Sequence, residues 1–417
     1  MLEQSKNERL LDGYLRSQGR DVLWNTELEG FSQTGAGVTA RVKTAAGESN
    51  TIEAKYLVGC DGAKSPVRHA LGLAFEGSTF ERTFYVADAQ VDWQFGHDGL
   101  TVSLSKETFV LFFPLKGENR YRIVGVFPEE FAKDEGDVLY EEIEARIKQE
   151  AGLELDIHDV AWFSTYKVHT RHVSSFNRGR CFLAGDSAHI HSPAGAQGMN
   201  TGIQDAYNLA WKMALVLKGE AGERLLDTYN EERLENAKNL LRTTDRVFQL
   251  AAGPEWFLSF LRTNVFPTVA GYLFSYDAVK RFVFPLVSQI GINYRHGSLS
   301  RHAGDEGFKV KAGDRMPYFL VDGESVYDRL RRPNFHLLAF TDEPGSSQAP
   351  EAAGPNADLV DFNSFHLSPQ VKKAFGTDRP FNVLLRPDNY VGYISPGPPS
   401  GEWKAYLNDL AAHSGGH

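Results

Sequence analysis

The sequence predicts an α/β fold, and three observations support this prediction. Two segments, 57–60 and 181–186, are almost continuously apolar up to an acidic residue, which is typical of strands buried on both faces of a sheet. The segment 84–127 instead alternates apolar and polar residues, as an antiparallel sheet does. Two long amphipathic segments, 199–217 and 223–250, predict helices. The chain is therefore expected to form a parallel sheet with covering helices and an inserted antiparallel sheet.

The other expected elements follow from the same patterns of hydrophobicity. The segment 3–18 places apolar residues such as Leu10 and Tyr14 on one face of a helix. Alternation predicts two half-buried strands, 38–42 and 52–56. Further along the chain we expect a helix from Asp137 to Gly152, packed helices within 256–292, a strand at 335–340, a loop at 343–355, a helix capped by Ser368, a hairpin at 386–389 and a final helix from Ser400.

Four segments are expected to form the domains. Residues 1–82 and 167–300 form the two parts of the parallel-sheet domain, and residues 83–166 form the inserted antiparallel sheet. A polar stretch that contains glycine, 294–304, marks the boundary to a small α/β domain at 301–417.

Charge and cysteine content narrow the class of protein. Lys and Arg number 44 against 54 Asp and Glu, a net charge of -10, so nucleic acid is not an expected partner. The two cysteines, Cys60 and Cys181, lie in apolar segments and are expected to be buried thiols of a reducing compartment, which predicts a cytoplasmic location. The first residues lack the pattern of a signal peptide, and no apolar run reaches the roughly 18 residues of a membrane-spanning helix, so no membrane is expected.

The strongest candidate site follows the second apolar strand. Asp186 stands at the carboxyl end of this strand, where ligands bind in open α/β sheets, and its carboxylate can accept a hydrogen bond from a sugar-type hydroxyl. Glycines in the next turn let the backbone approach a flat ligand closely, and free N–H groups at the start of the following helix stabilise negative charge. The other candidate residues here are Gly185, Pro193, Gly195, Gly198, Met199 and Asn200.

A second candidate site follows the first apolar strand. Asp61 comes directly after this strand, and the basic residues Lys64 and Arg68 follow it. Two roles for Asp61 stay open at this point. The carboxylate either contacts a ligand at the edge of the sheet, or it shares with Ser65 the capping of the short helix that follows.

Together the two motifs resemble, in content and in order, the Asp-Gly and Gly-Asp fingerprints of the class A FAD-dependent aromatic hydroxylases, which share the para-hydroxybenzoate hydroxylase fold. The segment 4–11 is similar to the glutamine-containing segment before the first fingerprint of that family. The segments 312–317, 335–340 and 385–388 resemble the C-terminal thioredoxin-like domain of the phenol hydroxylase branch. The resemblance implies an FAD-binding Rossmann-like sheet, an inserted antiparallel substrate sheet, and a thioredoxin-like domain at 301–417.

The resemblance also implies a reaction. FAD is the implied cofactor, NADPH or NADH is a transient co-substrate, and O2 supplies one oxygen atom to a small phenolic or polycyclic aromatic substrate. The strands at 84–127 would form the wall of the substrate pocket. Lys64 and Arg68 are candidates for the nicotinamide phosphates, against the alternative of ordinary surface ion pairs. The implied cofactor-binding residues are Gln4, Asp61, Gly185, Asp186, Pro193, Gly195, Gly198, Met199 and Asn200. No catalytic side chain is assigned, and a homodimer is an assembly to test.

One element of the family pattern is expected to be absent. The family opens with a strand, a Gly-x-Gly-x-x-Gly turn and a helix, which cradle the pyrophosphate. The similar glycine pattern here, 35–40, is followed by an alternating strand, so we expect a hairpin turn. The chain is therefore expected to lack the opening βαβ unit. This leaves an alternative function, a non-catalytic remnant of the fold that no longer binds FAD.

Two other classes of site fit parts of the same motifs. The segment 185–189 begins like a Gly-Asp-Ser hydrolase block, but the sequence has no separate Asp-x-x-His to supply the base, so this class is disfavoured. His189 and His191, with His169 and His172, offer nitrogen ligands for a metal. No acidic residue joins them at a ligand spacing, which favours hydrogen-bonded core histidines over a metal site.

Overall fold

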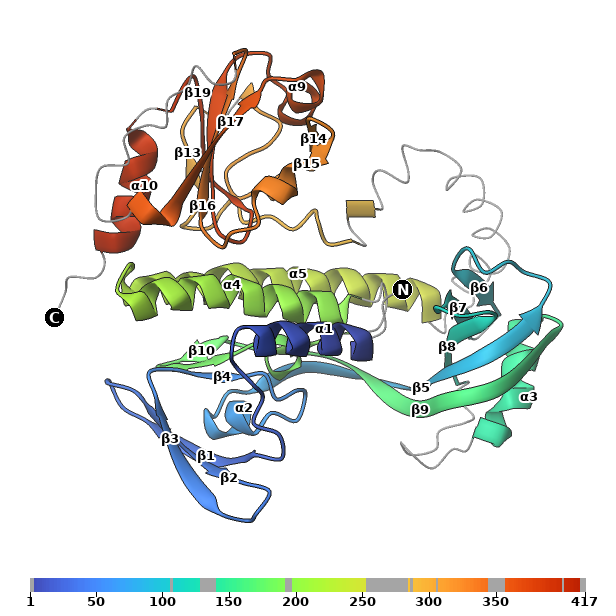
Figure 1. Ribbon diagram of the computed structural model, residues 1–417. Coiled ribbons are helices and arrows are strands. Elements are labelled where there is room, and N and C mark those ends of the chain that lie inside the picture. The colour runs from blue at the N-terminus through green and yellow to red at the C-terminus, as the bar shows by residue number, and fades with distance from the viewer. Residues whose placement is uncertain are drawn as a thin grey trace. The chain divides into compact units, whose positions relative to one another are not determined.

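The computed structural model describes residues 4–105, 108–127, 140–191, 197–252, 284–285, 288–304, 307–343, 357–399 and 401–412. The chain divides into two compact units (Figure 1). Unit 1 contains Met1–Met199 and Ala237–Val283, and unit 2 contains Asn200–Asn236 and Phe284–His417. The helices α4 (Gly198–Lys218) and α5 (Asp227–Ala252) each contribute residues to both units. The expected helix start at Asp137, most of the segment 256–292 and most of the loop 343–355 lie outside the described residues.

A small three-stranded sheet of unit 1, in which β4 and β11 are parallel and β10 is antiparallel, confirms the two predicted buried strands. Strand β4 (Leu57–Gly59) runs parallel to β11 (Cys181–Leu183), with Val58 opposite Phe182, and β10 (Asn177–Arg178) pairs with the other side of β11. Each side chain of β11 is buried. The short helix α2 (Pro66–Ala70) follows β4. The sheet thus brings together two segments that are more than a hundred residues apart in the sequence.

The N-terminal elements of unit 1 have the predicted type but less burial than expected. Helix α1 (Gln4–Ser17) has no buried residue, and Leu10 and Tyr14 are 66% and 65% exposed. The strands β1 (Glu27–Gln33), β2 (Val38–Lys43) and β3 (Ser49–Ala54) form an antiparallel sheet. Strand β2 alternates as predicted, but every residue of β3 is exposed, so half-burial was wrong for this strand. Residues 34–37 form the turn between β1 and β2, and residues 38–40 begin β2, which confirms the predicted hairpin.

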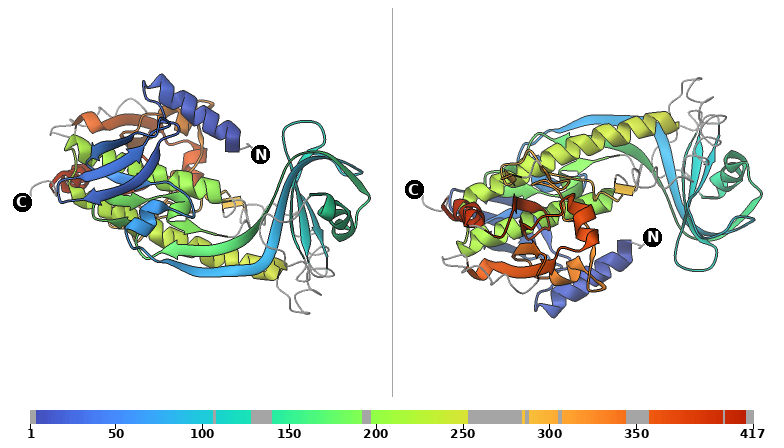
Figure 2. Two further views of the ribbon diagram at one scale, coloured as in Figure 1. Left: turned by 90° about the horizontal axis from the view of Figure 1, so that it is seen from below. Right: turned by 90° about the horizontal axis from the view of Figure 1, so that it is seen from above.

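The inserted antiparallel sheet is also confirmed. Its described strands lie in the order β12, β9, β5, β8, β7, β6, and helix α3 lies against one face, as both views of Figure 2 show. Tyr85 and Phe112 of that face pack with Ile147 of α3. Phe84, Phe109 and Tyr166 cluster on the opposite face. The bounds are β5 (Phe75–Trp93), β6 (Thr101–Leu104), β7 (Phe109–Pro114), β8 (Arg120–Val126), α3 (Tyr140–Ala151), β9 (Leu155–Val173) and β12 (His189–Ile190).

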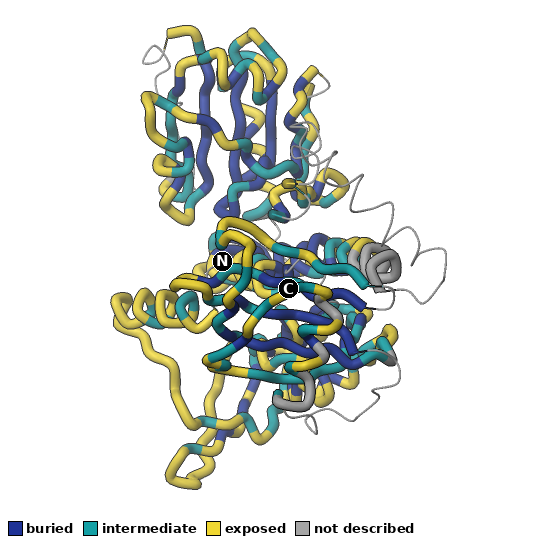
Figure 3. Tube along the Cα trace, turned by 90° about the vertical axis from the view of Figure 1, so that its right-hand side faces the viewer, coloured by how far each residue is buried: buried dark blue, intermediate teal, exposed yellow. Residues whose placement is uncertain are grey.

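Unit 2 contains a mixed sheet whose described strands lie in the order β13, β19, β18, β16, β17. The inner strands β16, β18 and β19 are almost wholly buried and are the dark blue segments at the top of Figure 3. Ser368 caps α9 by accepting a hydrogen bond from Val371 N, and β18 and β19 form a hairpin across 386–390, both as predicted. The bounds are η3 (Glu223–Leu226), β13 (Arg301–His302), β14 (Leu320–Val321), β15 (Glu324–Ser325), η6 (Val326–Arg329), β16 (Phe335–Thr341), η7 (Ala357–Leu359), β17 (Val360–His366), α9 (Pro369–Phe375), β18 (Phe381–Leu385), β19 (Val391–Pro396) and α10 (Glu402–Ala412).

The two cysteines differ in environment. Cys181 is fully buried in β11, and burial raises the pKa of its thiol to about 11. Cys60 is exposed just after β4, so the expectation that both thiols are buried was wrong for Cys60. The apolar run of β4 ends one residue earlier than the sequence suggested. No helix among the described residues is long and apolar enough to cross a membrane.

Candidate functional site

The two acidic residues singled out by the sequence lie at one edge of the parallel sheet. Strands β4 and β11 are parallel and in register from Leu57 opposite Cys181 to Gly59 opposite Leu183. Asp61 and Asp186 follow these strands by two and three residues. Because the carboxyl ends of parallel strands meet at the same edge, the fold brings the two fingerprints together at the position where open α/β sheets bind ligands.

Gly59 lies in close contact with α2 and β11, and this packing fixes the geometry of the sheet edge. A Cβ on Gly59 would lie 2.9 Å from Cβ of Val67 and 3.0 Å from Cδ2 of Leu183. These distances are shorter than real Cβ contacts, so α2 approaches the sheet this closely only because residue 59 has no side chain. The carbonyl of Gly59 then accepts hydrogen bonds from Ala184 N at 3.0 Å and from Ser187 Oγ at 2.6 Å.

Ser187 and Arg68 brace the turn that carries Asp186. This turn is the 3₁₀ helix η2 (Gly185–Ser187), and Ser187 is fully buried. Arg68 Nη1 donates to the carbonyl of Ser187 at 3.0 Å, and Arg68 Nη2 donates to the carbonyl of Ala63 at 2.7 Å. Because Ser187 is fully buried, it is not accessible as the nucleophile of a hydrolase. Its hydroxyl has a structural role instead, as the donor to Gly59.

Arg68 is therefore part of the scaffold of the site. Its side chain is 2% exposed and its guanidinium lies 4.0 Å from the centre of the Phe75 ring. Burial lowers the pKa of Arg68, while the nearby carboxylate of Asp61 raises it. An arginine held in this way does not face solvent, which argues against both expected roles, a contact with the nicotinamide phosphates and a surface ion pair. Lys64, four residues earlier, is exposed.

Asp61 has the capping role that the sequence left open. Its Oδ2 accepts a hydrogen bond from Val67 N at 3.0 Å, and Ser65 Oγ accepts one from Arg68 N at 2.9 Å. The side chain of Asp61 is nevertheless exposed. Asp61 therefore shapes the turn after β4, and one of its carboxylate oxygens is engaged in doing so.

Asp186 differs from Asp61 in its environment. Its carboxylate is exposed and makes no hydrogen bond to any described residue. Gly185 before it has φ = 65°, a left-handed conformation that favours glycine, and Gly62 after Asp61 has φ = 77° with no atom within 4 Å of an added Cβ. The edge thus presents an unengaged carboxylate next to two turns that need glycine.

The remaining candidates lie near the start of α4. Gly198 begins this helix, and Met199 and Asn200 in its first turn are exposed. Asn7 Nδ2 lies 3.9 Å from Sδ of Met199, so unit 1 brings α1 to this point from 192 residues away. Gln4, one turn before Asn7, is exposed and donates to Glu8. Pro193 and Gly195 lie outside the described residues.

The histidines near the motif are engaged in the sheet. His189 in β12 pairs with His172 in β9, and His189 stacks on Phe176 with ring centres 5.8 Å apart. His169 Nδ1 forms a hydrogen bond with Thr79 Oγ1. In the part of the chain that the structure describes, no group of three or more His, Cys, Asp or Glu side chains could hold a metal ion.

The roles of the residues that support this site were not predicted from the sequence. Ser187 was considered only as part of a hydrolase block, and Arg68 was expected to contact the nicotinamide phosphates or to form a surface ion pair. Their roles depend on hydrogen bonds from Ser187 to Gly59 and from Arg68 to Ser187. These residues are far apart in the sequence, so no local pattern indicates the bonds.

Comparisons with known proteins identify the family of the chain. Residues 1–244 match the family described as FAD binding domain. The chain is 34% identical to a flavin-dependent monooxygenase of Mycobacteroides abscessus, over 95% of this chain and 75% of that protein. It is 34% identical to pentachlorophenol 4-monooxygenase of Sphingobium chlorophenolicum, over 93% of this chain and 74% of that protein.

Solved structures show the same relationship. The anhydrotetracycline hydroxylase OxyS of Streptomyces rimosus superimposes with a TM-score of 0.76 at 26% identity, over 98% of this chain and 80% of that chain. The fold and the family match define a flavoprotein of the α/β type. The chain belongs to the class A FAD-dependent aromatic monooxygenases, and its cofactor is FAD.

Proposed function

We propose that this enzyme hydroxylates a phenolic or polycyclic aromatic compound, using NADH or NADPH and O2. The observation that carries the proposal is the meeting of both fingerprints at one sheet edge, in a chain of this family. The relatives support the substrate class, because their names specify pentachlorophenol and anhydrotetracycline. They also favour an enzyme over a non-catalytic remnant of the fold.

The residues at the edge fit FAD. The open space beside Gly62, the positive φ of Gly185 and the unengaged carboxylate of Asp186 suit a ligand with sugar hydroxyls and a flat ring. We assign Asp186 to the ribityl or pyrophosphate part of FAD, with Asp61 shaping the neighbouring turn. The remaining assignments follow the family resemblance and concern Gln4, Gly185, Pro193, Gly195, Gly198, Met199 and Asn200.

Bound FAD would supply the redox chemistry of the reaction, namely acceptance of a hydride from NAD(P)H and activation of O2, from which the transferred oxygen atom comes. The protein contributes position and electrostatics. The backbone N–H groups of Met199 and Asn200 belong to the first turn of α4, where they have no partner within the helix, and they are available to an electronegative edge of the ring. Ser187 and Arg68 keep the turn of Asp186 fixed.

The substrate wall is the face of the antiparallel sheet that carries Phe84, Phe109 and Tyr166. This face joins the cofactor segment through β12, which pairs with β9. Phe84 and Tyr166 stack with ring centres 5.8 Å apart. Burial raises the pKa of Tyr166 to about 12, so its phenol stays neutral at physiological pH. A neutral aromatic surface suits an apolar ring system.

The finer properties follow from the sequence. NADH or NADPH binds transiently at the flavin, and Lys64 is the exposed basic residue near Asp61 that is available to its phosphates. The protein functions in the cytoplasm, supported by its two free cysteines. A homodimer is tested directly by light scattering on the purified chain.

The function is tested by NAD(P)H oxidation in the presence of FAD, ¹⁸O2 and a panel of phenols and polycyclic phenols. We expect at least one aromatic compound to stimulate oxidation and to gain one ¹⁸O atom. If FAD binds but no compound in the panel stimulates oxidation or gains label, the hydroxylase proposal is refuted and the remnant of the fold is favoured.

A further inference from the structure

Side chains of unit 2 form hydrogen bonds with the first turns of α4. Thr201, the fourth residue of the helix, is fully buried. Gln289 Nε2 donates to Thr201 Oγ1 at 2.6 Å, and Arg233 Nη2 donates to the carbonyl of Thr201 at 3.3 Å. Gln204 Nε2 donates to Gln289 Oε1 at 3.0 Å. The start of this helix is therefore held by side-chain contacts as well as by its own backbone hydrogen bonds.

Arg233 makes the central contacts of this arrangement. It lies in α5 and is fully buried. Its Nε donates to Asp205 Oδ1 at 2.6 Å, and its Nη1 donates to the hydroxyl of Tyr294 at 2.8 Å. Each of its three nitrogens thus has a different partner, two of them on α4. A lysine has one nitrogen at the end of a flexible chain and cannot reproduce this fork.

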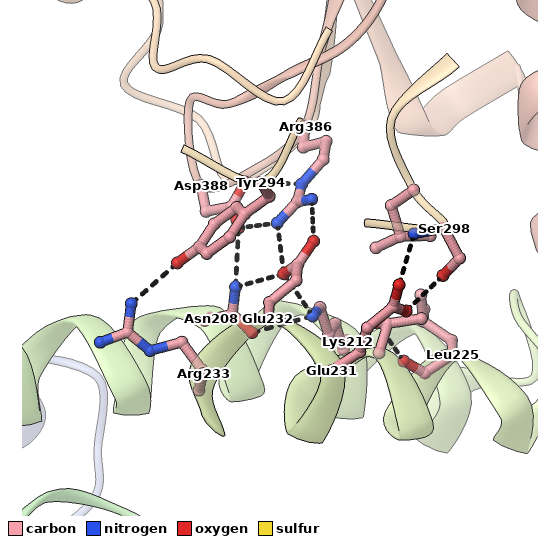
Figure 4. A network of polar contacts seen from close by, with 12 residues as sticks. Asn208, Lys212, Leu225, Glu231, Glu232, Arg233, Tyr294, Ser298, Arg386 and Asp388 are labelled. Carbon is pink, nitrogen blue, oxygen red and sulfur yellow. Dashed lines mark hydrogen bonds and ion pairs between the residues drawn. The ribbon is translucent and has the colours of Figure 1, made fainter. Parts of the chain in front are cut away.

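Arg233 lies beside a buried ion cluster, because its partner Tyr294 has the guanidinium of Arg386 5.4 Å from the centre of its ring. Arg386 donates to both carboxylates of Glu232 and Asp388, and Asn208 and Lys212 of α4 donate to Glu232. Figure 4 shows Arg233 pointing to Tyr294 beside this cluster. The Arg233–Asp205 pair and this cluster together form the ion network, which has three cations and three anions, each at most 5% exposed: Lys212, Arg233, Arg386, Asp205, Glu232 and Asp388.

Buried ion pairs contribute little net stability compared with apolar packing, but they fix the positions of the groups that they join. The groups fixed here are on α4, which begins with Gly198, Met199 and Asn200. We propose that Arg233 is a positioning residue that sets the first turn of α4, and with it the backbone N–H groups that face FAD. The inference rests on the proposed function, because that function assigns the start of α4 to the cofactor.

The experiment compares variants of the full chain. Arg233→Lys keeps the charge but loses the fork, whereas the pair Asp205→Asn with Arg233→Met removes one charge of each sign and keeps the network balanced. Tyr294→Phe removes one hydrogen bond of Arg233 and leaves Asp205 paired. The control is Arg331→Lys, because Arg331 forms an ion pair with Asp328 at the surface of the same unit, with the arginine side chain 77% exposed.

Two readouts separate positioning from stability. Amide hydrogen exchange is followed in peptides that cover 200–210 and, for reference, in peptides of the sheet at 335–341. FAD affinity is measured by titration, with visible circular dichroism of the bound flavin at saturation. For Arg233→Lys and for the neutral pair we expect exchange at 200–210 to rise about tenfold, FAD affinity to fall about tenfold, and the flavin spectrum to change. We expect a smaller change for Tyr294→Phe and none for the control.

The outcomes are distinct. Equal acceleration of exchange at 200–210 and in the sheet shows general destabilisation and overturns the inference, as does a loosened α4 with unchanged FAD affinity. A neutral pair that behaves like the unaltered chain also overturns it. If the unaltered chain itself binds no FAD, the proposed function fails, and this result is separate from any difference among the variants.

Discussion

Replacing Arg386 by methionine is expected to destabilise the protein severely. The guanidinium donates to Asp388 through Nε at 3.0 Å and Nη2 at 2.6 Å, and to Glu232 through Nη1 at 2.5 Å and Nη2 at 3.0 Å. All three side chains are at most 2% exposed. Methionine fills much of the same volume but leaves two buried carboxylates short of a cation. Removal of one partner from a buried ion pair costs ~3–5 kcal/mol, and we expect a loss of unfolding free energy in this range.

Urea-induced unfolding followed by tryptophan fluorescence measures the loss. Trp211 is a suitable reporter, because its indole N–H donates to Asp388 Oδ2 at 3.0 Å. The double variant Arg386→Met with Asp388→Asn restores the balance of charge and is expected to recover part of the loss. The control, Arg331→Met, breaks an exposed pair and is expected to cost less than about 1 kcal/mol. If Arg386→Met costs no more than this control, the reasoning about buried charge is refuted.

Three further changes test other parts of the structure. Gly59→Ala is expected to lower the free energy of thermal unfolding by ~1–3 kcal/mol, because the new Cβ would come within 2.9–3.0 Å of two neighbouring side chains. Gly35→Ala should be tolerated, because no atom lies within 4 Å of a Cβ at that position. Equal losses in the two variants would contradict the packing argument. Arg68→Met is expected to weaken FAD binding about tenfold without a matching rise in the nicotinamide KM, because Arg68 braces the turn of Asp186. Lys64→Met is expected to raise the nicotinamide KM and to leave FAD binding unchanged. If Arg68→Met raises the nicotinamide KM and leaves FAD binding unchanged, Arg68 belongs to the nicotinamide site. Burial by itself would raise the pKa of Glu232, but neighbouring cations hold this pKa below its ordinary value of 4.5. The stabilising contribution of Glu232 is therefore complete above pH 4.5 and is lost as the pH falls through the lowered pKa. Urea unfolding between pH 6 and 3 should show this loss of unfolding free energy, and an equal loss in Glu232→Gln would exclude Glu232 as its cause.

The type and order of the elements could be predicted from the sequence, because they depend on local periodicity. The strands at 57–60 and 181–186 and the two long helices were found at the predicted places. Burial could not be predicted equally well. The apolar face of α1 and the strand β3 follow the expected patterns but are exposed, because burial depends on which element packs against a face and not on the pattern itself.

The parts of the candidate site that directly follow a strand could be predicted from the sequence. The contacts between segments that are distant in the sequence could not. Asp61 and Asp186 were located because each follows an apolar strand, and parallel pairing brings them to one edge. The bonds of Arg68 to Ser187 and of Arg233 to Thr201 join residues 119 and 32 positions apart, so no spacing in the sequence indicates them.

Titration of the purified chain with FAD tests the central claim, that the edge formed by β4 and β11 holds the cofactor. The unaltered chain is compared with Asp186→Ala and with Asp98→Ala, which removes another exposed carboxylate of unit 1. We expect saturable binding of added FAD by the unaltered chain, a loss of affinity of about tenfold or more for Asp186→Ala, and a change of less than about twofold for Asp98→Ala. Equal FAD affinity in the Asp186→Ala variant and the unaltered chain would contradict the account.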